Sequence, residues 1–182
     1  MKKTLLLITL AFSVLTGYAK PDFDIPNIDN YESEEACRKD NDIAYKTAKY
    51  YLSAPLPEDA LWVFPAAHYI MVWTEASKDL TVYVGQNISP YLECESQDIS
   101  KQLAIAYFSG CIIYCLENKQ KEHDFNMHYF ALSQMLTYYE KNRDVTGRDK
   151  KMDDYLKMFK KGKQLLKLHQ LGQPLLQPSL TY

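Results

Sequence analysis

The chain has 182 residues, of which 47% are hydrophobic and 24% charged, and its formal net charge is −2. This composition excludes a disordered chain, and six glycines and eight prolines are too few for a collagen-like or low-complexity sequence. The small acidic net charge gives no general attraction to nucleic acid, so we expect no nucleic-acid partner.

The first 19 residues predict a secretory signal peptide. Two lysines precede an uncharged, mostly apolar run from Thr4 to Thr16, and Gly17 and Ala19 place small residues at the −3 and −1 positions of a cleavage site. The run is too short to span a membrane, which takes roughly 20 residues. Cleavage would remove two lysines and change the net charge from −2 to −4. We expect a periplasmic or secreted protein with no transmembrane segment after signal removal.

The N-terminal part of the mature chain predicts an irregular arm followed by a helix. Residues 20–32 contain two prolines and several Asp and Asn residues, which favour irregular structure. Ser33, followed by two glutamates, predicts a helix start, and the apolar stripe that follows includes Cys37 and ends before Pro55. We expect one helix over this stretch, at the beginning of a helical domain that spans residues 33–172.

A second helix is predicted from Pro57 to about residue 76. Pro65 lies inside it and should kink or restart the helix, because proline removes a backbone hydrogen bond. Residues 80–85 alternate apolar and polar side chains and predict a short extended segment, either a connector or an edge strand.

The central region predicts a buried helix from about Asp98 to Asn118. Residues 103–116 carry no charge and are apolar on nearly every side, which is typical of the centre of a bundle. Gly110 lies inside this run and predicts the close approach of a neighbouring helix.

Two more helices complete the prediction. Asp124 is a candidate cap for the fourth helix, residues 142–149 predict a loop, and a fifth helix runs from Met152 to Leu166. Residues 173–182 predict an extended C-terminal tail. Five helices joined by short polar turns indicate an all-α, single-domain helical bundle or array.

Several short segments occur along the chain in a definite order: Trp73-Thr74, residues 79–84, Tyr107 to Gly110, residues 116–118, and Tyr138 to Asn142. Their order and spacing resemble those of small secreted α-helical proteins of Bacteroidota-type bacteria. The resemblance covers roughly residues 60–165 and implies an extracytoplasmic helical protein, without catalytic residues that could be transferred.

The four cysteines allow either free thiols or a disulfide. Cys111 and Cys115 are four residues apart on one helix, where Cβ atoms lie about 5–6 Å apart, too far for a bridge. Cys37 and Cys94 are the residues most able to pair, although a domain of this size does not need a disulfide. Without a Cys-x-x-Cys pair, four cysteines do not predict a zinc site.

The motif search finds no glycine-rich phosphate loop, nucleophile elbow or zinc-protease pair, and we expect no cofactor. His123 and His128 are weak candidates for a metal site, because five residues on a helix leave them about 140° apart. His68 lies among aromatic and aliphatic residues, where it could be a core histidine, a ligand or a general base.

Fifteen tyrosines against seven phenylalanines are the most informative feature of the composition. They could pack between helices with their hydroxyls satisfied, or line an aromatic groove. In the second interpretation, the binding residues are Trp62, His68, Tyr69 and Trp73.

Charge is unevenly distributed along the chain. Residues 20–42 contain eight acids and three bases, whereas residues 148–169 contain eight bases and three acids. These could be two solvated surfaces, or the acidic region could dock on the basic helix, within one chain or between two.

We therefore expect an exported, non-enzymatic helical interaction module of the bacterial envelope, binding a protein, peptide or glycan through an aromatic-rich surface. The alternative is a small periplasmic hydrolase or metal-dependent enzyme that uses His68 or the pair His123 and His128.

Overall fold

The protein is all-α. The structure is a computed structural model, and it describes residues 20–54, 60–82 and 92–162. No strand occurs among these residues. The predicted signal peptide, the predicted tail from residue 173 and the part of the predicted fifth helix beyond residue 162 lie outside the described residues. The helices are α1 (Glu34–Lys39), α2 (Asn41–Ser53), α3 (Ala60–Ala76), α5 (Gln97–Asn118), α6 (Phe125–Thr146) and α7 (Lys150–Lys160).

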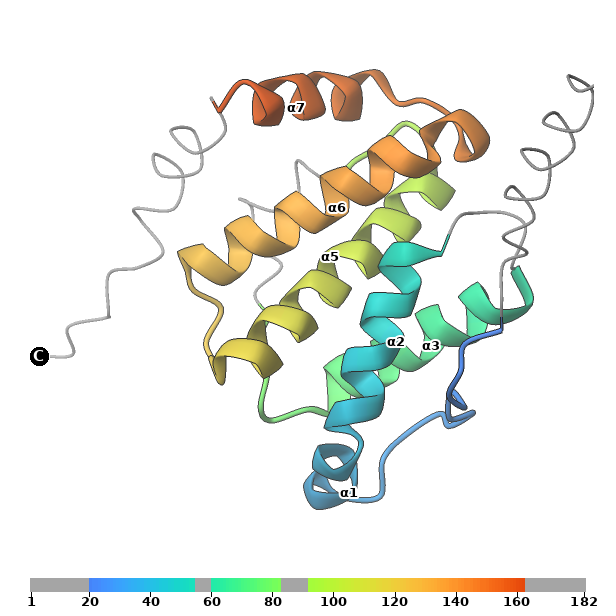
Figure 1. The fold of residues 1–182 in the computed structure, drawn as a ribbon, viewed down its shortest axis with the longest axis vertical. Helices are drawn as coiled ribbons and strands as arrows, with labels where there is room; N and C mark the ends of the chain where they lie inside the picture. The colour runs from blue at the N-terminus through green and yellow to red at the C-terminus, as the bar shows by residue number, and fades with distance from the viewer. Residues whose placement is uncertain (1–19, 55–59, 83–91, 163–182) are drawn as a thin grey trace, which may run out of the picture.

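The helices form an array around α5. This helix packs against α2, α3 and α6, while α7 packs on the outer side of α6 (Figure 1). Its length and apolar composition would also suit a membrane-spanning helix, but here it contributes ten buried residues to the core. The prediction of a buried central helix is confirmed.

The predicted first helix is two helices with a break at Asp40. Ser33 caps α1 as expected, with its hydroxyl accepting a hydrogen bond from the Ala36 amide at 3.2 Å. Asp40 ends α1 with a non-helical ψ of 10°, and its carboxylate accepts a hydrogen bond from the Tyr31 hydroxyl at 2.9 Å. The Tyr31 hydroxyl also lies 2.8 Å from that of Tyr69, so this junction anchors the N-terminal arm to α3.

Helix α3 continues through Pro65 and does not restart there. Proline removes the hydrogen bond to the carbonyl group of Leu61, four residues earlier. Both residues are exposed, so water can satisfy that carbonyl. Of the two outcomes predicted for this proline, a kink or a restart of the helix, the restart was wrong.

Gly110 allows α5 and α6 to pack closely. A Cβ atom added at Gly110 would lie only 2.6 Å from the Cα atom of Ala131 on α6. Ordinary carbon contacts are 3.5–4.0 Å, so only a glycine fits without displacing the neighbouring backbone. The predicted close approach of a helix is confirmed.

Helix α6 begins as expected but ends later than predicted. The Asp124 carboxylate caps it by accepting the Met127 amide at 2.8 Å. The expected loop at residues 142–149 is helical as far as Thr146, and the side chains of Asn142 and Thr146 donate hydrogen bonds to carbonyls of the preceding turn. The turn is confined to the residues around Gly147, which has a φ of 104°.

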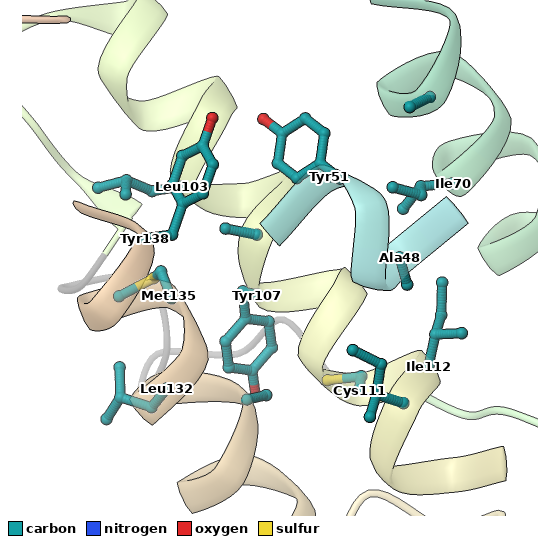
Figure 2. Close-up of a cluster of buried hydrophobic side chains, with 14 of the residues drawn as sticks. Ala48, Tyr51, Ile70, Leu103, Tyr107, Cys111, Ile112, Leu132, Met135 and Tyr138 are labelled. Atoms are coloured by element: carbon teal, nitrogen blue, oxygen red, sulfur yellow. The ribbon is translucent and has the colours of Figure 1, made fainter. Parts of the chain in front are cut away.

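Large side chains from α2, α3, α5 and α6 meet in the core (Figure 2). The rings of Tyr51 and Tyr138 stack with centroids 5.2 Å apart, and the Tyr51 hydroxyl donates to the Gln102 carbonyl at 3.2 Å. Across the α6–α7 turn, the buried Tyr139 hydroxyl lies 2.9 Å from both the amide and the carbonyl of Asp149. These tyrosines therefore serve helix packing.

The described part of the predicted extended segment, residues 80–82, is not a strand. The Thr81 amide donates to the Lys121 carbonyl at 3.0 Å, which ties this connector to the turn between α5 and α6. Residues 83–85 lie outside the described residues.

Within the part of the chain that the structure describes, the acidic N-terminal region does not dock on the basic α7. Helix α1 packs against α2 and α3, whereas α7 packs against α6, and the two helices lie at opposite ends of the array (Figure 1). The intramolecular form of that hypothesis is wrong for the described residues, and acids of the N-terminal region pair with bases one turn away, such as Glu34 with Arg38 at 2.8 Å and Glu35 with Lys39 at 3.1 Å.

Candidate functional site

Helix α3 presents an apolar stripe to solvent. Leu61 is 83% exposed, Phe64 69% and Met71 42%, values unusual for large apolar side chains in a folded protein. The opposite side of the same helix is fully buried against α2 and α5. The exposed stripe is therefore a candidate binding surface, which we call the α3 stripe and define as Leu61, Phe64, His68 and Met71.

The α3 stripe has the spacing of a coiled-coil seam. Its members follow one another at intervals of three, four and three residues, which is the a and d pattern of a heptad repeat. No Asp, Glu, Lys or Arg occurs between Ala60 and Thr74, so the charges beside the stripe come from Asp29 and Lys20 of the N-terminal arm. The helix itself presents a mostly apolar face.

His68 and Trp62 link this surface to the N-terminal arm. The His68 side chain is half exposed, with Nε2 3.1 Å from the Ile28 carbonyl oxygen and 3.3 Å from a carboxylate oxygen of Asp29. Trp62 is half-buried, and the Lys20 ammonium lies 5.1 Å from its ring centroid, within cation–π range. The arm therefore lies along one side of the stripe.

Tyr69 and Trp73, the other two residues predicted for binding, are fully buried in the core. They cannot contact a ligand at the surface, so this part of the predicted aromatic groove was wrong. The spacing of these residues correctly predicts that they share one face of a helix. Because this helix is apolar on most sides, its sequence does not show which face is exposed to solvent.

A second candidate site contains His123 and His128, whose side chains were predicted to point in different directions. The Tyr107 hydroxyl lies 2.7 Å from Nε2 of His123 and 2.7 Å from Nδ1 of His128. The two imidazole rings have centroids 5.7 Å apart. His123 lies in the turn before α6, and the chain direction there differs from that of a helix, so the predicted divergence of 140° does not apply.

This cluster holds neutral groups. Burial, together with the neighbouring His123, lowers the pKa of His128 to about 4, and burial lowers the pKa of His123 as well. Burial raises the pKa of Tyr107 well above its ordinary value. At neutral pH the single hydroxyl proton of Tyr107 is donated to one ring, and the other ring must donate its own N–H to the oxygen.

The cluster offers little opportunity for catalysis or metal binding. A general base works best with a pKa near the operating pH, whereas the pKa of His128 is far below neutrality. Nε2 of His128 is buried and has no hydrogen-bond partner in the described part of the chain. Among the described residues, no group of three or more His, Cys, Asp or Glu is arranged to hold a metal ion.

An open surface hollow of about 380 Å³ lies between α2 and the end of α5. It is lined by Asn41, Asp42, Tyr45, Leu116 and Glu117, and the Tyr45 hydroxyl donates to the Glu117 carboxylate at 2.6 Å. Asp42 is paired with Lys46 at 2.6 Å. Tyr45, Glu117 and Asp42 thus bind one another or their own helix, whereas the buried Oδ1 of Asn41 has no hydrogen-bond partner among the described residues. None of the predicted site residues lines the hollow.

All four cysteines are free thiols in this structure. Cys37 lies against the Trp73 carbonyl between α1 and α3, whereas Cys94 lies near Asp149 at the start of α7. The pair that the sequence favoured for a disulfide is therefore placed in different parts of the array. Cys115 donates to the Asp79 carbonyl at 3.0 Å, so it acts as a weak hydrogen-bond donor in the core.

Comparison with protein-family models, with curated proteins and with solved structures finds no match. The resemblance to small secreted helical proteins thus stays a prediction.

Proposed function

We propose that the protein is an exported, non-enzymatic interaction module of the bacterial envelope, and that it binds a partner protein through the α3 stripe. The observation that carries the proposal is the solvent exposure of Leu61, Phe64 and Met71 on one helix face. Export is supported by the signal-like pattern of residues 1–19.

The size of the exposed surface supports a binding role. With side-chain areas of roughly 150–200 Å², the exposed fractions of these three residues correspond to on the order of 350 Å² of apolar surface. Patches of this size on monomers are often functional. At about 25 cal/mol per Å², covering the patch would contribute at most about 9 kcal/mol, from which the cost of association must be subtracted. This suits reversible binding.

The observations favour binding over the enzymatic alternative. His68, one of the proposed catalytic residues, holds the N-terminal arm through the Ile28 carbonyl. His123 and His128 are engaged with Tyr107, and no described hollow opens onto them.

The proposal is tested by capture from a native envelope extract, with residues 20–182 as bait. Phe64→Asp and Leu61→Asp introduce a charge into the α3 stripe at exposed positions, where folding should be preserved. Val145→Asp on α6 is the matched control, because Val145 is also apolar and 57% exposed. We expect a partner that binds the wild-type and V145D chains but not the two α3 variants. Equal capture by all four chains would contradict a role for the α3 stripe.

A further inference from the structure

We propose that His68 and Met71 form a surface site for a soft monovalent metal ion, Cu(I). This site lies outside the proposed function, because it assigns a ligand to two side chains and needs no partner protein. Two observations carry it: the N-terminal arm fixes the tautomer of His68, and an exposed thioether follows one turn later along α3.

The contacts of His68 leave one ring nitrogen available to a metal. Nε2 lies 3.1 Å from the Ile28 carbonyl oxygen and 3.3 Å from a carboxylate oxygen of Asp29. Both oxygens only accept hydrogen bonds, so Nε2 carries the proton, and in the neutral ring Nδ1 carries the lone pair. The side chain is 50% exposed, and among the described residues no hydrogen bond reaches Nδ1. Metal-binding histidines commonly donate their other N–H to a carbonyl or carboxylate, which fixes the ring and makes the ligand nitrogen more basic.

Met71 supplies a second donor on the same face of α3. Residues three apart on a helix have Cβ atoms about 5–6 Å apart, and helical side chains lean toward the N-terminus, so the Met71 side chain extends over the turn that holds His68. The sulfur and Nδ1 each lie two bonds from their Cβ atom, so both can reach one ion at the distances of about 2.3 Å and 2.0 Å found in zinc sites. Met71 is 42% exposed, whereas Met127, Met135 and Met152 are fully buried. Met71 is therefore the thioether of the described surface that an ion reaches most easily.

This pair of donors selects a soft ion. Thioether sulfur and imidazole nitrogen suit Cu(I), whereas Ca²⁺ and Mg²⁺ require oxygen ligands and Zn²⁺ usually takes four ligands from Cys, His and carboxylates. Helix α3 carries no lysine or arginine that would repel a cation, and the Asp29 carboxylate beside His68 adds a favourable charge. With two protein ligands on an open surface, the ion should exchange readily, which suits transfer between proteins more than stabilisation of the fold.

Nuclear magnetic resonance of residues 20–182, isotope-labelled at the methionine methyl groups and histidine rings, tests the site with Ag(I) as a redox-stable probe for Cu(I). Cys94→Ser removes the one thiol that is not fully buried, and Ag(I) is added in excess over the remaining three. We expect the resonances of the Met71 methyl group and of His68 Nδ1 to shift together, while that of the half-buried Met158 stays in place. Uptake of Ag(I) without a shift at Met71 would overturn the proposal.

Two variants in the same Cys94→Ser chain test whether the ligands act together. Met71→Leu should remove the shift of His68, and His68→Gln should remove the shift of Met71. Glutamine retains an N–H donor for the Ile28 carbonyl, and circular dichroism identifies any variant that fails to fold. Met158→Leu is the matched control and should leave both shifts unchanged. A Met71 shift that persists in H68Q would overturn a shared site.

Competition for Cu(I) against a chromophoric chelator, with ascorbate as reductant, measures the affinity. Loss of either ligand should weaken binding by more than the roughly 10–100-fold that follows loss of an outer hydrogen-bond partner. Zn(II) should leave Met71 unshifted, and an equal response to Zn(II) and Ag(I) would overturn the assignment to a soft ion. The partner-binding variants F64D and L61D retain both ligands, so loss of partner capture leaves the metal site standing, and absence of Ag(I) binding leaves the proposed function standing.

Discussion

Substitution of Gly110 by alanine sets two effects of opposite sign against each other. In an isolated helix, alanine is favoured over glycine by about 1 kcal/mol. In this fold, the new methyl group would lie 2.6 Å from the Cα atom of Ala131, about 1 Å closer than carbon atoms tolerate. Overpacking of this kind costs about 1–3 kcal/mol, and here the atom in the way is backbone, which cannot rotate aside. Because the obstructing atom is backbone, we take the upper end of this range, about 3 kcal/mol; subtracting the gain of about 1 kcal/mol leaves an expected net loss of about 2 kcal/mol in the free energy of unfolding.

Thermal and urea unfolding of residues 20–182 measure this loss. For a chain of this size, 2 kcal/mol corresponds to a decrease of roughly 4–8 °C in Tm. Thr137→Ala, at an exposed position of α6, is the control and should change stability by less than about 0.5 kcal/mol. Replacing Ala131 with glycine should not rescue G110A, because the obstructing Cα atom remains. If G110A stabilises the protein by about 1 kcal/mol, helix propensity dominates and the close contact between α5 and α6 is refuted.

Three further predictions concern the core. The pKa of His128 is 6.5 in the unfolded chain and about 4 in the folded protein. As the pH decreases, the imidazole is therefore protonated in the unfolded chain before it is protonated in the folded protein, which favours unfolding. Stability should therefore fall by about 3 kcal/mol between pH 6.5 and pH 4. His128→Gln should flatten that part of the curve measured by urea unfolding, and an unchanged curve would refute the burial of His128. Tyr139→Phe leaves the Asp149 amide without its 2.9 Å partner and should cost about 1–3 kcal/mol, whereas a neutral result would mean that water replaces the hydroxyl. Burial raises the pKa of Cys94 to about 11, so a disulfide reagent at pH 8 should label this half-buried thiol slowly and the three buried thiols more slowly still. Rapid labelling of all four thiols in the native chain would contradict their placement.

Local signals predicted the helices where a side chain acts on its own backbone. The sequence predicts a helix start at Ser33 and a cap at Asp124, and both side chains accept a hydrogen bond from the amide three residues later. Gly110 predicts a close helix contact, because glycine inside a helix is otherwise unfavourable. These signals depend only on residues close in sequence, so the helix starts and the close contact can be predicted without knowledge of the fold.

Predictions failed where a distant residue decided the outcome. The break at Asp40 depends on Tyr31, nine residues away, whose hydroxyl holds the carboxylate outside a regular helix. The continuation of α6 beyond Asn142 accompanies the burial of that side chain, which is 2% exposed. Neither the Tyr31 contact nor this burial can be read from a local window, so the sequence favours one helix in the first case and a loop in the second.

The two candidate sites were hidden for different physical reasons. The α3 stripe is present in the sequence as intervals of three, four and three, but α3 is apolar on almost every side, and only packing against α2 and α5 selects which stripe is left exposed. The Tyr107 cluster depends on a turn, because His123 precedes the Asp124 cap and does not follow helical geometry. Because the cap residue Asp124 lies between His123 and His128, the angle between the two side chains cannot be calculated from helical geometry. Both imidazole rings instead lie within hydrogen-bond distance of the Tyr107 hydroxyl.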